Sequence, residues 1–140
     1  VLAERVREGV WDRPLEGDIL QPRDSRGLFE ADQDASAGAR VAAGEVHPTA
    51  PLPGKAGMAS SAACRHLEAR ALSGCDALIE ALAGEGVDAA RRATRLPVNG
   101  LQWAWSEGDV LTLGFDLPTG AFATTVLAEL VETHTPVNEN

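Results

Sequence analysis

Two alternating segments followed by a helical one, between residues 101 and 130, constrain this chain most strongly. Apolar side chains occupy every second position in Leu101, Trp103 and Trp105, and again from Leu111 to Phe115. A period of two predicts strands that turn one face toward a core. The polar cluster Ser106 to Asp109 contains a glycine and predicts a hairpin turn. We therefore expect a strand, a tight turn and a returning strand.

An amphipathic helix is expected directly after this hairpin. Pro118 ends the second strand because proline cannot donate to a ladder, and Thr119 is the expected N-cap. Phe122, Val126 and Leu130 then recur at helical spacing and form one apolar face. We expect the first turn of this helix, at Phe122, to pin it against the strands.

The chain before residue 92 predicts shorter elements separated by many loops. Helices are expected over Val1–Glu8, Asp32–Ala43, Met58–Leu72, Cys75–Ala83 and Val87–Ala90, and short strands over Gly17–Gln21, Leu28–Glu30 and Ala93–Val98. The segment from Gly44 to Lys55 is rich in proline and glycine and predicts a connecting loop. The mixture indicates an α+β fold, with a boundary near residue 92 where the composition changes.

The charge distribution limits what this chain can bind. The formal net charge is −9 over 140 residues, and every Lys and Arg lies at or before Arg95. A general nucleic-acid binder usually carries a basic stripe, so tight RNA binding by this chain alone is not expected. The two cysteines and three histidines lack the spacing of metal ligands, and no apolar run is long enough to span a membrane. We expect neither a metal nor a membrane partner, and a cytoplasmic location.

Three stretches could carry chemistry. The loop before Lys55 could cradle a phosphate through backbone N–H groups, or simply connect two elements. Arg91, Arg92 and Arg95 form the densest basic cluster. Arg92 and Arg95 could meet RNA phosphates, or the cluster could form a solvated helix end. Phe122 could stack on a base, or could belong to the core.

No catalytic nucleophile is evident in the chain. Asp18, Asp109 and Asp116 lie at strand edges or turns, where Asp is common for backbone reasons. None of them is paired with a base by sequence. The residues alone therefore indicate an acidic α+β chain without a complete active site.

Five motifs resemble, in the same order, those of the TruD family of tRNA pseudouridine synthases. The segment LPTGAFATTVLAEL at residues 117–130 is similar to the family's LP-x-G-S-aromatic-A-T-S-V-L-R-E-L ending. GEVHPTAPLPGK resembles the family's GDIHPTGPLPG loop. The remaining three are VLAERV with the following G-V-W, LEGDILQ, and RRATRLPVNGLQWAW.

The resemblance implies a pseudouridine-synthase fold that is interrupted by an insertion domain. It places residues 1–92 in that insertion domain and residues 93–140, with the strand-turn-strand-helix unit, in the catalytic domain. The implied reaction isomerises uridine at position 13 of tRNA without a cofactor, through attack by an aspartate and rotation of the detached base. That aspartate lies in a G-x-K-D motif that this chain lacks, as it lacks the N-x-F-x-x-Q-R-F-G motif. The chain is therefore expected to be a fragment, inactive alone, that associates with an N-terminal portion carrying the nucleophile.

The resemblance also implies site residues. Phe122 matches the aromatic that borders the uracil pocket, and Gly120 and Thr124 match positions that shape the same turn. With Lys55, Arg92 and Arg95 they form the expected substrate-binding set. Ala121 and Thr125 replace the family's serines, and Ala128 stands where Arg is usual.

Two other functions remain open from the sequence. The chain could be a non-catalytic RNA- or protein-binding module, or an unrelated small α+β enzyme, which the lack of a nucleophile–base pair disfavours. A hairpin with one helix is marginal alone, so we expect exposed apolar surface around Trp103, Trp105 and Phe115.

Overall fold

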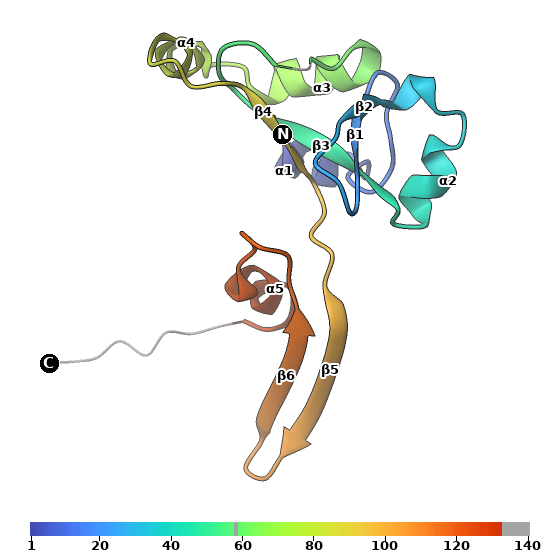
Figure 1. Ribbon diagram of the computed structural model, residues 1–140. Coiled ribbons are helices and arrows are strands. Elements are labelled where there is room, and N and C mark those ends of the chain that lie inside the picture. The colour runs from blue at the N-terminus through green and yellow to red at the C-terminus, as the bar shows by residue number, and fades with distance from the viewer. Residues whose placement is uncertain (58, 133–140) are drawn as a thin grey trace, which may run out of the picture. The chain divides into compact units, whose positions relative to one another are not determined.

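The chain forms two compact units, Val1–Arg95 and Leu96–Asn140 (Figure 1). The structure is a computed structural model that describes residues 1–57 and 59–132. Both helices and strands occur in each unit, as expected of an α+β chain. The units meet at Arg95, three residues after the change in composition.

The N-terminal unit is built on a four-stranded sheet with the order β2-β1-β3-β4, in which every neighbouring pair is antiparallel. Its elements are α1 (Leu2–Arg7), β1 (Ile19–Pro22), β2 (Phe29–Glu30), a 3-10 turn η1 (Ala31–Gln33), α2 (Ala37–Ala42), β3 (Val46–Leu52), α3 (Ala62–Ala71), α4 (Asp76–Gly84) and β4 (Ala90–Ala93). The helices expected near α1, α2, α3 and α4 and the strands expected near β1 and β2 are confirmed. Met58, the expected start of the third helix, lies outside the described residues.

The central strand β3 is the first correction, because the loop predicted over Gly44 to Lys55 is wrong. β3 pairs with β1 through residues 46–48 and with β4 through residues 49–52. Pro48 lies beyond the β4 pairing and Pro51 beyond the β1 pairing. Each proline thus has a ladder on one side only, where a residue without an N–H donor is tolerated.

The strand β4 is the second correction. The helical turn predicted over Val87–Ala90 and the strand predicted over Ala93–Val98 are both wrong, since the strand covers Ala90–Ala93 and belongs to the N-terminal sheet. In its register Arg91 lies opposite Pro51 and Arg92 opposite Ala50. Residues 90–93 form a strand here because they pair with the open edge of β3, and the local pattern of apolar residues does not reveal this pairing.

A small apolar core holds one face of the sheet. Its buried members come from β1, η1, α2 and β3: Leu20, Ala31, Ala37, Val41 and Val46, with Phe29 packed against them. Three of these side chains, Leu20, Val41 and Val46, have no exposed surface. Burying a Val or Leu side chain contributes about 1.5–3 kcal/mol, so this cluster is the main apolar support of α2 on the sheet.

The C-terminal unit is a hairpin followed by one helix. β5 (Asn99–Ser106) pairs with β6 (Val110–Asp116), and Trp103 lies opposite Leu113. The predicted turn is confirmed: Gly108 and Asp109 both have positive φ, +76° and +59°, as a tight hairpin turn requires. α5 (Ala123–Leu130) follows.

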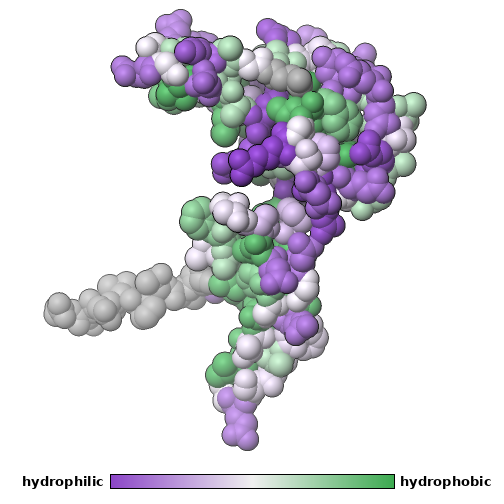
Figure 2. All heavy atoms as spheres, in the orientation of Figure 1, coloured by the Kyte–Doolittle hydropathy of each residue, from purple (hydrophilic) through white to green (hydrophobic). Residues whose placement is uncertain are grey.

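The prediction that one face of β5 enters a core is wrong within this unit. All eight residues of β5 are exposed, and the exposed fractions of Trp103 and Trp105 are 67% and 63%. A two-stranded ribbon with one helix has no second layer to cover that face (Figure 2). The expected exposed apolar surface is confirmed for the two tryptophans, whereas Phe115 is half-buried.

The start of α5 also differs from the prediction. Phe122, not Thr119, is its N-cap residue, and the exposed fraction of Phe122 is 72%. Val126 is the buried residue of this helix. The prediction that Phe122 pins the helix to the strands is therefore wrong, because its side chain is exposed.

Candidate functional site

The turn before α5 presents an aromatic side chain to solvent. Gly120 has a φ of +88°, a conformation that side-chain-bearing residues rarely adopt. The N–H of Ala121 donates to the carbonyl of Pro118 at 3.1 Å, which closes this turn. Phe122 follows in extended conformation, and Thr124 is exposed on the first turn of α5. The turn thus groups Gly120, Phe122 and Thr124, with the Phe122 ring free to stack.

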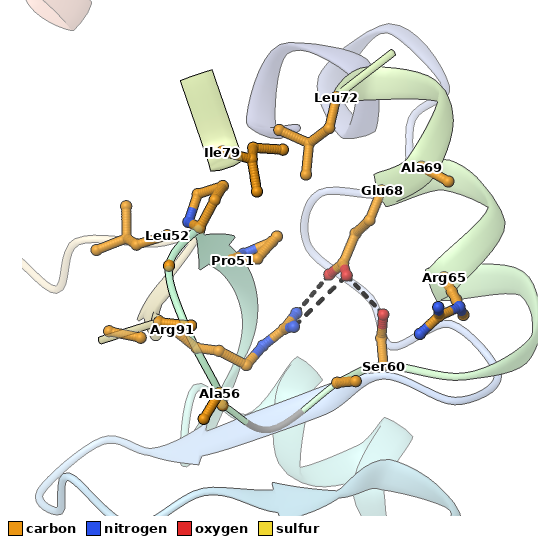
Figure 3. A pocket seen from close by; sticks show the side chains of 16 residues that line it. Pro51, Leu52, Ala56, Ser60, Arg65, Glu68, Ala69, Leu72, Ile79 and Arg91 are labelled. Carbon is orange, nitrogen blue, oxygen red and sulfur yellow. Dashed lines mark hydrogen bonds and ion pairs between the residues drawn. The ribbon is translucent and has the colours of Figure 1, made fainter. Parts of the chain in front are cut away.

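A second site is a hollow of about 470 Å³ in the N-terminal unit (Figure 3). Its walls come from the end of β3, residues 53–57 and 59–60, α3 with the following Leu72, Ile79 of α4 and residues 89–91. Ligand pockets usually measure about 300–1,000 Å³, so the volume suffices for a small molecule or one nucleotide. This hollow is next to the loop that the sequence singled out as a phosphate cradle.

Close backbone packing fixes the loop that walls the hollow. A Cβ on Gly54 would lie 2.4 Å from the carbonyl oxygen of Val87 and 2.6 Å from the nitrogen of Ala89. The N–H of Lys55 donates to the Val87 carbonyl, and the N–H of Ala89 donates to the Lys55 carbonyl. Glycine at position 54 is therefore what allows this loop to lie against residues 87–89.

A buried ion pair, Glu68 with Arg91, lines the hollow. The side chains are 9% and 3% exposed, and Arg91 Nη2 pairs with Glu68 Oε1. Ser60 Oγ donates to Glu68 Oε2 at 2.5 Å (Figure 3). Arg91 Nε donates to Thr49 Oγ1 at 2.7 Å. Because each partner is held by further hydrogen bonds, the pair is structural support for α3 against β3 and β4.

A second buried ion pair lies deeper, between α1 and the start of β1. Arg5 Nη2 donates to Asp18 Oδ1 at 2.8 Å, and neither side chain has exposed surface. Asp18 also accepts the N–H groups of Leu15 and Ile19. Cys64 Sγ lies 3.2 Å from Arg5 Nη2 and 3.4 Å from both Asp18 Oδ1 and Glu68 Oε1, so it links the two pairs.

The environment sets three pKa values. Burial raises the pKa of the Cys64 thiol to about 12, and the charges of Asp18 and Glu68 act in the same direction. Burial also acts to raise the pKa of Glu68, but the hydrogen bonds from Arg91 and Ser60 outweigh this effect, so the pKa of Glu68 is lowered. The pKa of His47 is lowered by burial and by the positive charges of Arg95 and Arg23.

The basic residues nominated from the sequence differ in their surroundings. Lys55 is 60% exposed, with Asp88 Oδ1 3.9 Å from its Nζ, and Arg92 is exposed on β4. Arg95 is half-buried: its guanidinium donates to His47 Nδ1 at 3.2 Å and to the carbonyls of Val41 and Val46 at 2.8 and 2.9 Å. All three belong to the N-terminal unit, and the Phe122 turn to the C-terminal unit.

Sequence reasoning missed the residues that build the hollow. Glu68 and Arg65 read as ordinary charged positions on a helix surface, and Arg5 as one on a short helix. The available signal was a charged residue, Glu68, on the Ala-rich helix α3, but its partner Arg91 lies 23 positions further along the chain. Asp18, a candidate for chemistry, is wholly engaged in the ion pair with Arg5.

Metal-binding clusters and membrane-spanning helices are both absent from the described residues. In residues 1–57 and 59–132, no three His, Cys, Asp or Glu side chains are grouped so that they could hold a metal ion. Within the same ranges, none of the helices has both the length and the apolar character needed to cross a membrane.

Comparison with known proteins gives one consistent family. The family model of tRNA pseudouridine synthase D (TruD) matches residues 1–130. Over 133 residues the chain is 45% identical to tRNA pseudouridine synthase D of Pseudomonas aeruginosa (strain LESB58), which covers 94% of this chain and 37% of that protein. The namesake from Azotobacter vinelandii (strain DJ / ATCC BAA-1303) is 44% identical over 133 residues, with 94% and 38% covered.

A solved structure agrees with these sequences. The crystal structure of a TruD protein from Methanosarcina mazei superimposes with a TM-score of 0.69 at 26% identity, covering 91% of this chain and 34% of that one. The chain thus spans about 37% of the length of the curated relatives it matches. With a family model over residues 1–130 and the same fold in a solved relative, this chain belongs to the TruD family of tRNA pseudouridine synthases.

Proposed function

We propose that this chain is part of an enzyme that isomerises uridine to pseudouridine at position 13 of tRNA. In this proposal residues 1–92 form the insertion domain, and residues 93–140 belong to the catalytic domain. The nucleophilic aspartate comes from the further length that the relatives have, since this chain spans about 37% of them. The protein works on tRNA in the cytoplasm and needs no cofactor.

The observation that carries the proposal is the exposed ring of Phe122. In the family's ending the matching aromatic borders the uracil pocket, and here 72% of Phe122 is exposed beside the turn at Gly120. Single exposed apolar side chains are common on proteins, so the support comes from the place of this ring, beside the Gly120 turn and within the motif that resembles the family's ending. Stacking on a base that has been flipped out of the RNA is the contact that fits the family's reaction.

Phosphate contacts supplement this stacking. Lys55 and Arg92 are exposed cations that can meet the RNA backbone. Arg95 is the third nominated cation, but its guanidinium already donates to His47, Val41 and Val46. We therefore assign the direct phosphate contacts to Lys55 and Arg92.

The test is a pseudouridylation assay with the full-length enzyme on unmodified tRNA. Phe122→Ala is expected to lower kcat/KM about ten- to hundredfold, since stacking of a base on an aromatic ring is worth about 1–3 kcal/mol. Phe122→Tyr is expected to retain activity. Leu130→Ala, which truncates another exposed apolar side chain at the far end of α5, is the control. Equal activity of the Phe122→Ala and Leu130→Ala enzymes would contradict the assignment.

A non-catalytic binding module is the second candidate, and the exposed tryptophans favour it. Trp103 and Trp105 form an apolar face on β5 that suits contact with protein, either a separate partner or the remaining portion of the enzyme. Supplying that portion in trans distinguishes the two. Activity on complementation supports the synthase, whereas binding without activity, with both pieces folded, supports the module.

A further inference from the structure

The hollow beside α3 offers a ligand apolar surface and one positive charge. Leu52, Leu72 and Ile79 supply aliphatic wall, together with the rings of Pro51 and Pro53. Glu68 and Arg91 also face it, but their charges cancel, and the two side chains are bonded to one another and Glu68 to Ser60 (Figure 3). Arg91 Nε donates to Thr49 as well. The net charge available to a ligand therefore comes from Arg65.

Arg65 differs from Arg70 and Arg91 in having no acidic partner among the described residues. Arg70, five residues later on the same helix, pairs with Glu8, and Arg91 pairs with Glu68. Within the part of the chain that the structure describes, the Arg65 side chain is exposed and has no hydrogen-bond or ion-pair partner. A guanidinium presents a planar fork of donors that matches phosphate oxygens.

An aliphatic slot with a guanidinium at its side suits a flat, weakly polar group that carries a phosphate. From this we infer that the hollow receives one nucleotide of an RNA strand, with the base against Leu72 and Ile79 and the phosphate on Arg65. The inference rests on the proposed function for its ligand, because tRNA is the RNA that the enzyme would hold. It adds a contact site separate from the turn at Phe122.

The hydrogen bonds that Glu68 already accepts predict how well this site can distinguish one base from another. Glu68 accepts bonds from Arg91 and Ser60, so it has little capacity left to read the edge of a base. Contacts to a nucleotide are then stacking on aliphatic surface and charge on the phosphate, both of which tolerate any base. We expect uridine and cytidine monophosphates to bind alike.

Isoleucine methyl NMR tests this on the 140-residue chain, because the sequence holds only two isoleucines. Ile79 lines the hollow, whereas Ile19 is fully buried in the sheet and serves as an internal control. Titration with uridine 5′-monophosphate is expected to shift the Ile79 δ1-methyl signal with a dissociation constant of millimolar order. Uridine without the phosphate is expected to bind about tenfold more weakly.

Two variants locate the phosphate. Arg65→Gln is expected to weaken uridine 5′-monophosphate about tenfold and to leave uridine unchanged. Arg70→Gln removes a cation from the same helix outside the hollow and is expected to change neither. An unshifted Ile79 signal, a concerted shift of Ile79 and Ile19, or equal affinity of Arg65→Gln and wild type would each overturn the inference. An apolar peptide that shifts Ile79 where the nucleotide does not would replace it with a protein contact.

Assays of the full-length enzyme separate this inference from the proposed function. Arg65→Gln is expected to raise KM for tRNA several-fold with kcat unchanged, and Arg70→Gln to alter neither. An inactive wild type would refute the proposed function, and the NMR titration would still show whether the hollow binds a nucleotide. An active wild type with an unaltered Arg65→Gln enzyme would refute the nucleotide site alone.

Discussion

Cys64 lies where three charged side chains meet, and this position sets its reactivity. Burial raises the pKa of its thiol to about 12, with the charges of Asp18 and Glu68 adding to the effect. Only the thiolate attacks an alkylating agent, so Cys64 is expected to be nearly inert at about pH 8. Iodoacetamide should modify the half-buried Cys75 at least tenfold faster in the folded chain, as measured by peptide mass spectrometry. In urea the two rates should converge; fast labelling of native Cys64 would show that the buried cluster opens.

His47 makes stability depend on pH near neutrality. Arg95 Nε donates to His47 Nδ1, so the ring must be neutral at that nitrogen. Its pKa in the folded chain is lowered from 6.5 by burial and by Arg95 and Arg23. Unfolding therefore takes up a proton, and the stability contributed above the unfolded pKa is lost as the pH falls through the folded one.

The matching measurement is urea unfolding at several pH values between about 7 and 5. The wild type should lose stability across this window. His47→Gln keeps an acceptor for Arg95 without titrating and should show a flatter pH dependence, whereas His66→Gln, on exposed α3 surface, should keep the wild-type slope. Identical slopes for the two variants would exclude His47 as the source.

At the residue scale, the sequence could nominate Phe122 but not the hollow. Phe122 lies in one contiguous motif, so its context can be read locally. Glu68 and Arg91 are 23 positions apart, and Arg5 and Asp18 are 13 apart, so nothing local marks them as pairs. Arg65 becomes a candidate contact only because the fold places it in the wall of the same hollow as Pro51 and Ile79.

At the level of elements, hairpin β5–β6 was predictable and the pairing of β3 with β4 was not. The hairpin strands alternate cleanly and are joined by a glycine turn, so their partners are sequence neighbours. β3 carries two prolines, which usually indicate a break, and its partner β4 lies about forty residues away. Long-range pairing made a strand of a segment whose local composition favours a loop.

Gly54 allows a test of how the loop after β3 is held against residues 87–89, which precede β4. Gly54→Ala places a Cβ 2.4 Å from the Val87 carbonyl oxygen and should force the loop off residues 87–89. Overpacking of this kind costs about 1–3 kcal/mol, measured as the free energy of unfolding in urea. Gly38→Ala, inside α2 with no atom within 4 Å of the new Cβ, is the control and should be neutral or stabilising. Equal stability of the two variants would mean that the loop is not held against residues 87–89.

At the scale of the molecule, the two units differ in how well their strands are covered. In the N-terminal unit β1 and β3 each have strands on both sides, and most of their side chains are buried. In the C-terminal unit β5 has one partner and no buried side chain. Buried apolar side chains therefore stabilise the strands before Arg95 more than the hairpin that follows. The end of β4 is also held to β3, because the Thr94 hydroxyl donates to the Pro48 carbonyl.

Hydrogen exchange of the 140-residue chain should report this difference directly. Amides of β1 and β3 open only with their unit, whereas amides of β5 need only the hairpin to separate, so β5 should exchange at least about a hundredfold faster after correction for intrinsic rates. Trp103 and Thr49 are the amides to compare, since one is 67% exposed and the other is fully buried. Equal protection at both would mean that the face of Trp103 and Trp105 is covered in solution. In that case the tryptophan face would already be engaged in this chain, and it could not be the surface that receives the remaining portion of the enzyme.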